Sequence, residues 1–124
     1  MIGLRADSEN RYRIFVDTVL ETKTVWGLRS ADGWAVAPSN EFEDVDVMPF
    51  WSHRASAKAV AREEWADYEP SELDLESFVA KWLRGMHEQG YRVGTNWNTS
   101  LVGLELEPIE LARTLLDTDS AEGE

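Results

Sequence analysis

The segment SELDLESFVAKWLRGMHEQGYRVGTNW, residues 71–97, decides the fold class, because a helical pattern passes directly into a strand pattern within it. Its apolar residues recur at intervals of three and four, which predicts one buried helix face made of Leu75, Phe78, Val79, Trp82, Leu83 and Met86. Gly90 stands just past the last turn, where glycine commonly ends a helix. The following YRVGTNW predicts a strand, so helix and sheet belong to one unit.

On the carboxyl-terminal side, a further strand, LVGLELE, is predicted after a connection around residues 98–100. Pro108 suits the first position of a last helix, whose inward face we expect to be Leu111, Ala112, Leu115 and Leu116. Residues 117–124, DTDSAEGE, lack apolar anchors, and we expect them to form a disordered acidic tail.

On the amino-terminal side, an amphipathic helix is predicted behind an Asp7-Ser8 cap, with an apolar face of Tyr12, Phe15, Val16, Val19 and Leu20. Strand-forming residues then lie on both sides of Asp32-Gly33, a pair typical of a hairpin turn. Pro38 is expected to end the second strand of that hairpin.

A third strand is predicted at residues 45–51, after the acidic connector NEFEDVD. It contains Pro49, which cannot donate a ladder hydrogen bond and is therefore expected at an edge or at a point where the strand leaves the sheet. An alanine-rich helix is predicted to start after Ser52 and to end before Pro70. Its inward residues would be Ala57, Val60, Ala61 and Trp65.

The predicted order is α-β-β-β-α-α-β-β-α, which describes one α+β domain over residues 8–116. We expect helices packed on a single sheet of about five mostly antiparallel strands. The chain has 124 residues, 43% of them hydrophobic, and six tryptophans, so it can bury a substantial core.

The formal charge of -12 disfavours nucleic acid and anionic membranes as partners, because the surface potential repels phosphate. The excess of acid either maintains solubility or docks the protein onto a basic partner. Cysteine is absent, and no apolar run reaches the roughly 20 residues that span a bilayer. These features predict a soluble cytoplasmic protein without disulfides.

Metal and covalent chemistry find little support in the residues. The only histidines, His53 and His87, are predicted on different helices, and we expect no metal and no cofactor. Ser52 adjoins His53, but adjacent side chains at a helix start are expected to diverge, and no G-x-S-x-G elbow is present. The simpler expectation for Ser52 is an N-cap, and no catalytic residue is predicted.

Two strand ends nevertheless carry polar and aromatic groups that suit a binding site. The first holds Trp51, Ser52, His53 and Arg54, and the second holds Asn96, Trp97 and Asn98. An exposed Trp97 would suit ligand stacking, although tryptophan in small domains is more often a core residue. The site requires both ends to share one rim. Since His53 and Arg54 oppose the dipole of their helix, we also expect an internal carboxylate, or else a bound anion, to offset them.

The ordered motifs VWGL, DGWA, PFWSHRASA, EEWADYEP, LESFVAKWLRGM, GYRVGTNWN and GLELEPIELA resemble the DUF2750 family of small bacterial proteins of unknown function. The resemblance extends from about Arg11 to Leu115 and is weakest in the acidic connector. The second half is also similar, more faintly, to the amino-terminal domain of the enhanced-serine-sensitivity (SseB-type) proteins. Both resemblances imply a bacterial accessory domain and assign no catalytic residue.

Two functions from different classes remain open at this point. The first is a non-enzymatic acidic module that binds a partner protein, and an immunity or inhibitor protein that neutralises a basic toxin is a special case of it. The second is a small-ligand, anion or hydrolytic site at the two strand ends. The oligomeric state does not follow from the sequence.

Overall fold

The computed structural model describes residues 2–122, with side chains described for residues 7–117, and it has the predicted α+β character. The elements in chain order are α1 (Ile2–Thr22), β1 (Thr24–Ser30), β2 (Gly33–Trp34), β3 (Ala37–Pro38), β4 (Asp46–Phe50), α2 (Arg54–Val60), the 3-10 turn η1 (Glu63–Trp65), β5 (Glu69–Asp74), α3 (Leu75–Ser77), the π-helical segment η2 (Phe78–Leu83), α4 (Arg84–Gln89), β6 (Arg92–Thr95), β7 (Leu104–Leu106) and α5 (Pro108–Glu122).

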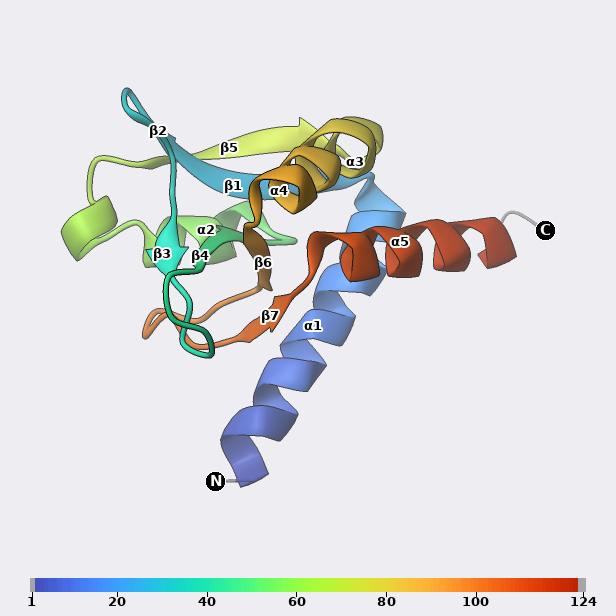
Figure 1. Ribbon diagram of the computed structural model, residues 1–124, viewed down its shortest axis with the longest axis horizontal. Helices are drawn as coiled ribbons and strands as arrows, with labels where there is room; N and C mark the ends of the chain where they lie inside the picture. Colours follow the sequence, from blue (N-terminus) through green and yellow to red (C-terminus); the bar gives the residue numbers. More distant parts are fainter. Residues whose placement is uncertain (1, 123–124) are drawn as a thin grey trace.

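The strands form two sheets, where the sequence predicted one. One sheet has the order β2-β1-β5 and the other β3-β4-β6-β7 (Figure 1). The pairing of β4 with β6 is parallel, and the other pairings are antiparallel. The sheets are joined where Trp26 and Trp51 exchange two backbone hydrogen bonds of 2.8 and 2.7 Å.

A further difference is β5, since its residues 71–74 were predicted to begin a helix after the break at Pro70. The segment EPSELD is rich in acidic residues and lacks strand-type apolar alternation, but it pairs with β1 along its whole length, from Glu69 opposite Arg29 to Asp74 opposite Thr24. β5 is an edge strand of its sheet, and none of its residues is fully buried, so its polar side chains keep contact with solvent. Tertiary pairing therefore overrides a weak local preference.

The first hairpin is confirmed. Ser30 pairs with Gly33 across the turn, and Gly33 has a φ of 126°, which glycine adopts readily. The predicted second strand is divided into β2 and β3. Pro49 belongs to an inner strand, but it lies between the end of the β3 pairing at Val47 and the bridge at Trp51, so its missing donor falls in a gap of the ladder.

Two predicted helix starts are corrected. The first helix begins at Ile2, and Ser8 is a buried residue inside it where a cap was predicted. The third predicted helix begins at Leu75, because Asp74 caps it by accepting the Ser77 N–H at 2.9 Å. Its predicted end is confirmed, since Gly90 follows α4 in the left-handed conformation with a φ of 80°.

The helix after the third strand also differs from its prediction. His53 occupies the N-cap position of α2, so the predicted cap at Ser52 is wrong. The helix ends at Val60, and Trp65 belongs to the separate turn η1.

The core consists of two clusters of buried residues. The first lies among α1, η2, α4, α5 and the sheets, and contains Phe15, Val16, Val19, Leu20, Val25, Phe50, Phe78, Leu83, Met86, Val93, Leu111 and Leu115. The second surrounds α2 and contains Leu28, Ala35, Ala37, Val47, Trp51, Ala57, Val60, Trp65 and Trp97. Trp82 is half-buried against the first cluster, and Leu116, predicted inward, is 54% exposed.

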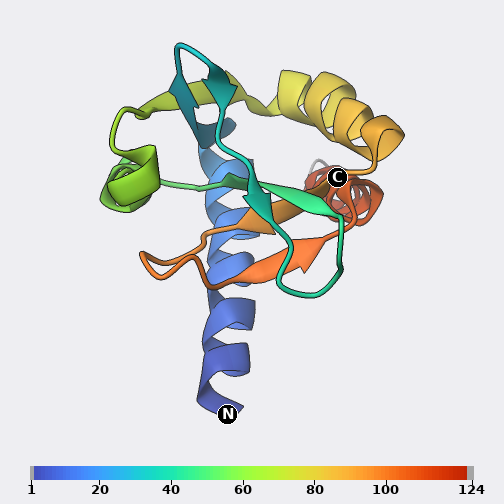
Figure 2. The same ribbon diagram turned by 60° about the vertical axis from the view of Figure 1, so that its left-hand side comes forward.

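The helices enclose the sheets unevenly. The η2–α4 segment and α5 lie on one side of the sheets, and the amino-terminal half of α1 extends beyond them (Figures 1 and 2). Within residues 2–122, no helix combines the length and apolar character needed to cross a membrane. The predicted tail from residue 117 falls almost entirely beyond the described side chains and stays a prediction, although the α5 backbone runs to Glu122.

Candidate functional site

The carboxyl ends of β4 and β6 lie side by side because these strands are parallel neighbours. Phe50 is opposite Thr95, and the Asn96 N–H donates to the Phe50 carbonyl at 2.9 Å. The chain therefore brings Ser52 and His53 next to Asn96. This is the shared rim that the predicted site required.

Asn96 connects three segments at this rim. Its Oδ1 accepts the Ser52 N–H at 2.9 Å, while its Nδ2 donates to the Ser52 Oγ at 3.0 Å and to the Arg11 carbonyl at 3.1 Å. The residue is 8% exposed and has a φ of 48°, a left-handed conformation that asparagine tolerates better than most residues. One amide thus satisfies both donors and acceptors in a buried position.

The side chains of Ser52 and His53 were expected to diverge, but the structure places them in contact. The Ser52 Oγ lies 3.1 Å from the His53 Nδ1. The same hydroxyl has a second acceptor in Asn96 Oδ1 at 3.3 Å, so its proton can point toward either neighbour. Ser52 is only 3% exposed, so its oxygen is held inside the network, whereas His53 is exposed.

Arg11 clamps α1 onto the same region and was not singled out by the sequence. Its Nε donates to the Asn96 carbonyl and its Nη2 to the Val102 carbonyl, both at 2.9 Å. The guanidinium also pairs with Asp7 and reaches the Ser8 Oγ at 3.2 Å. The bonds to Asn96 and Val102 join residues more than eighty positions apart, so no local sequence pattern predicts them.

The two tryptophans of the predicted site are buried. The Trp51 Nε1 donates to the Trp97 carbonyl at 2.9 Å, and the Trp97 Nε1 donates to the Leu104 carbonyl at 3.0 Å. Trp97 is 2% exposed, so it is a core residue and its ring is not open for ligand stacking. Its ring rests on two glycines, since a Cβ at Gly94 would lie 2.6 Å from it and one at Gly103 closer still.

The remaining predicted residues have separate roles. Asn98 folds its own turn, because its Oδ1 accepts the N–H groups of Ser100 and Val102. Arg54 forms no ion pair with any side chain of residues 7–117, so the predicted internal carboxylate is not found there. Nor do these side chains include a group of three or more placed to hold a metal ion.

A pocket of about 390 Å³ opens beside this network, lined by Arg11, Ile14, His53, Ser56, Ala59, Val60, Asn96, Trp97, Asn98 and Thr99. Most polar atoms facing it are already paired within the protein. The arrangement can fix the strand ends and α1 in place. Ligand binding or hydrolysis at the seven predicted residues stays a prediction.

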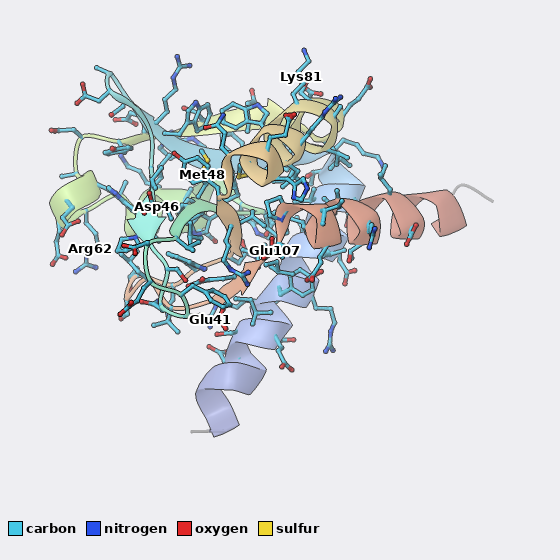
Figure 3. All side chains as sticks on the ribbon, in the orientation of Figure 1. Glu41, Asp46, Met48, Arg62, Lys81 and Glu107 are labelled. Atoms are coloured by element: carbon cyan, nitrogen blue, oxygen red, sulfur yellow. The ribbon has the colours of Figure 1, made fainter. Side chains whose placement is uncertain are left out.

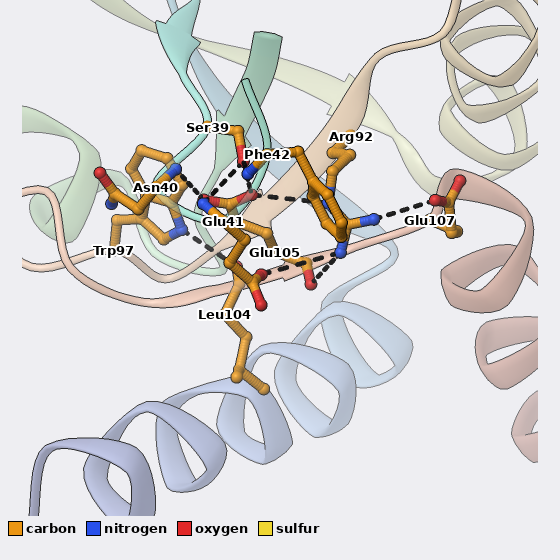
Figure 4. Close-up of polar contacts among 9 residues, drawn as sticks. All are labelled: Ser39, Asn40, Glu41, Phe42, Arg92, Trp97, Leu104, Glu105 and Glu107. Carbon is orange, nitrogen blue, oxygen red and sulfur yellow. Dashed lines mark hydrogen bonds and ion pairs between the residues drawn. The ribbon is translucent and has the colours of Figure 1, made fainter. Parts of the chain in front are cut away.

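A second polar cluster fixes the acidic loop, residues 39–46, which the sequence had left without a role (Figure 4). The Glu105 carboxylate is its centre, with a side chain only 2% exposed. It accepts the Ser39 hydroxyl at 2.6 Å and the Asn40 N–H at 2.8 Å. These bonds tie the start of the loop to β7.

Arg92 balances the buried charge of Glu105. Its Nε lies 3.5 Å from Glu105 Oε1, and its Nη1 donates to Glu107 at 2.9 Å. A third carboxylate, that of Glu41, lies 3.8 Å from Nη2. The guanidinium also lies over the Phe42 ring, 4.8 Å from its centroid, so one cation holds both the loop and β7 (Figure 4).

The acidic loop therefore presents an anchored aromatic ring to solvent. Phe42 is 51% exposed although Arg92 covers one face, and Glu43, Asp44 and Asp46 around it are exposed as well. The signal available in the sequence was a phenylalanine between acidic residues. Its rigid support by Glu105 comes from a distant strand and could not be read locally.

The fold and these two clusters define a small α+β domain with an anchored acidic loop. Its two sheets are interlocked in the sense that β5 of one sheet lies in sequence between β4 and β6 of the other. Residues 12–115 match the family described as "Protein of unknown function (DUF2750)", and the chain belongs to that family. No curated protein and no solved structure matches the chain.

Proposed function

We propose that this protein is a bacterial, cytoplasmic, non-enzymatic interaction module that binds a basic partner protein through its acidic loop. The observation that carries the proposal is Phe42, a large aromatic side chain that is half exposed on an anchored loop among carboxylates. Aromatic anchors dominate the energetics of many protein interfaces.

Anchoring of the loop favours binding because it lowers the entropy lost on association. Glu105 fixes Ser39 and Asn40, and Arg92 fixes the ring of Phe42. A preformed loop presents its anchor without ordering many side chains when the partner arrives. The exposed face of Phe42 would then enter an apolar pocket of that partner.

Charge complementarity gives the partner its chemistry. The chain carries 24 acidic and 12 basic residues, and the loop adds exposed carboxylates of its own. A basic surface would be attracted over long range, with an association rate that falls as salt is added. A basic toxin is one protein of this kind, and the domain would then serve as its immunity protein.

The test is affinity capture of partners from the native host by three immobilised proteins. Phe42→Ala removes the anchor, and Ile109→Ala, which truncates a comparably exposed residue at 41%, is the matched control. We expect a basic protein to be retained at low salt by the parent and the control and lost by Phe42→Ala. Equal retention by all three, or no specific protein at low salt, would contradict the proposal.

A further inference from the structure

A second groove, whose lining includes no residue of the acidic loop, has the composition of a small-molecule site. It has a volume of about 400 Å³, within the roughly 300–1,000 Å³ of ligand pockets. It lies between the sheets and the helical segment η2–α4, and is lined by Trp34, Val36, Met48, Lys81, Trp82, Gly85, Met86, Gln89 and Tyr91. Its walls are aromatic or apolar, and its polar groups are few.

Two tryptophans from different parts of the chain form one wall. The rings of Trp34 and Trp82 meet edge to face, with centroids 4.7 Å apart, and both are only half-buried. Gly27 allows this placement, because a Cβ there would lie 2.8 Å from the Trp34 ring. The fold thus places two large aromatic side chains at a concave site and leaves part of each accessible.

Gly85 is the second observation that points to an occupant. Glycine weakens a helix interior, yet a Cβ built at Gly85 meets no atom within 4 Å. Packing within the chain therefore does not require glycine at this position of the groove. A bound molecule that approaches the helix backbone would require it.

The π-helical segment immediately before Gly85 supports the same site. π-Helical turns are rare and often found at functional sites. Here the turn spans Phe78–Leu83 and supplies both Lys81 and Trp82 to the groove. The irregular backbone and the helical glycine thus converge on one cavity.

Charge selects the class of ligand. Among the described residues, Lys81 is the one charged residue in the lining of the groove. Its exposed side chain extends outward, whereas Met48 lies beside α4 (Figure 3). Arg29 already lies over the Trp34 ring, 5.7 Å from its centroid. Two cations and no lining carboxylate disfavour a cationic ligand in spite of the aromatic walls.

We propose that this groove binds a small, flat, apolar molecule that carries a carboxylate or another anionic group. The apolar body lies between the aromatic walls above Gly85, and the anionic group faces Lys81. This site is separate from the acidic loop, so it does not depend on the proposed protein interaction.

The test compares three probes of one shape by calorimetric titration: naphthoate, the neutral naphthalenemethanol and the cationic naphthylmethylamine. We expect naphthoate to bind most tightly. Lys81→Gln should weaken naphthoate about fivefold, the effect of one charge contact near water, and leave the neutral probe unchanged. Arg84→Gln removes a neighbouring cation outside the groove and is the matched control, expected to have no effect.

Gly85→Leu tests whether naphthoate binds in this groove, because the added side chain would fill the groove and leucine has a higher helix propensity than glycine. We expect it to abolish naphthoate binding with an unchanged or raised melting temperature. If Gly85→Leu unfolds the protein, the comparison of naphthoate affinity between Lys81→Gln and Arg84→Gln still tests the proposal. Absence of binding by all three probes, tightest binding of the cation, or equal loss in Lys81→Gln and Arg84→Gln would overturn the proposal.

Discussion

The cluster around Asn96 and the cluster around Glu105 both join distant segments, but they use different chemistry. At Asn96 a neutral side-chain amide bonds the backbone N–H and the hydroxyl of Ser52 and the backbone carbonyl of Arg11, with donor and acceptor matched in each bond. At Glu105 a buried carboxylate is balanced by Arg92. The neutral cluster depends on the position of one amide, whereas the ionic cluster depends on a balance of charge.

The largest expected effect comes from breaking the ionic cluster. Glu105→Ala should reduce the free energy of unfolding by about 3–5 kcal/mol, because it leaves Arg92 without its buried partner. Urea unfolding measures the change. Glu105→Gln keeps an acceptor for Ser39 but removes the charge, and we expect an intermediate loss. An unchanged midpoint for both variants would show that Glu107 and Glu41 suffice for Arg92.

Breaking the neutral cluster should cost somewhat less. Asn96→Ala should reduce the free energy of unfolding by about 2–3 kcal/mol, because the buried Ser52 N–H loses its acceptor. Asn96→Gly is the control, since glycine accepts the positive φ of this position without strain. If alanine and glycine are equally harmful, the hydrogen bonds matter and the backbone conformation does not.

Two serines compare the clusters directly. Ser39 donates to a carboxylate and Ser52 accepts from an amide, and hydrogen bonds to charged groups are the stronger. We expect Ser39→Ala to cost about 2 kcal/mol and Ser52→Ala about 1 kcal/mol, as measured by parallel denaturation curves. The reverse order would mean that the buried amide cluster contributes more than the ionic one.

Asp74 extends the comparison to an exposed carboxylate and should show the smallest effect. The Ser77 backbone N–H, together with its hydroxyl, holds the pKa of Asp74 below its ordinary value of 3.8. A lowered folded-state pKa contributes stability above the unfolded value, and this contribution is lost as pH falls through the folded value. Asp74→Asn keeps a cap and should reduce only this acid dependence in thermal melts below pH 4. An identical acid profile in the variant would contradict the assignment.

The sequence predicted what local chemistry determines. The Asp32-Gly33 turn specified the first hairpin, and Gly90 specified a helix end, because turn residues act on their own neighbours. It also located Ser52 and Asn96 directly after strands, but whether those strand ends lie side by side was left as a requirement that only the fold could answer. The assignment of β5 failed because its strand character depends on β1, which lies far away in the chain.

The clusters themselves were largely beyond sequence reasoning. Arg11 and Glu105 are ordinary charged residues until the fold places Asn96 and Ser39 beside them. For Trp97 the sequence left two placements open, an exposed stacking ring between two amides and a core residue. Its burial requires Gly94 and Gly103, and their pairing with that ring follows only from the pairing of β6 with β7.

The interlocked order of the sheets has a consequence for synthesis on the ribosome. In chain order, β4 belongs to the four-stranded sheet, the next strand β5 belongs to the three-stranded sheet, and β6 belongs again to the four-stranded sheet. Until β6 emerges, the β4 edge that it will cover has no partner and can pair with another chain. Nascent chains halted between β5 and β6 should therefore aggregate or recruit chaperones, and release should follow once β6 and β7 have left the exit tunnel.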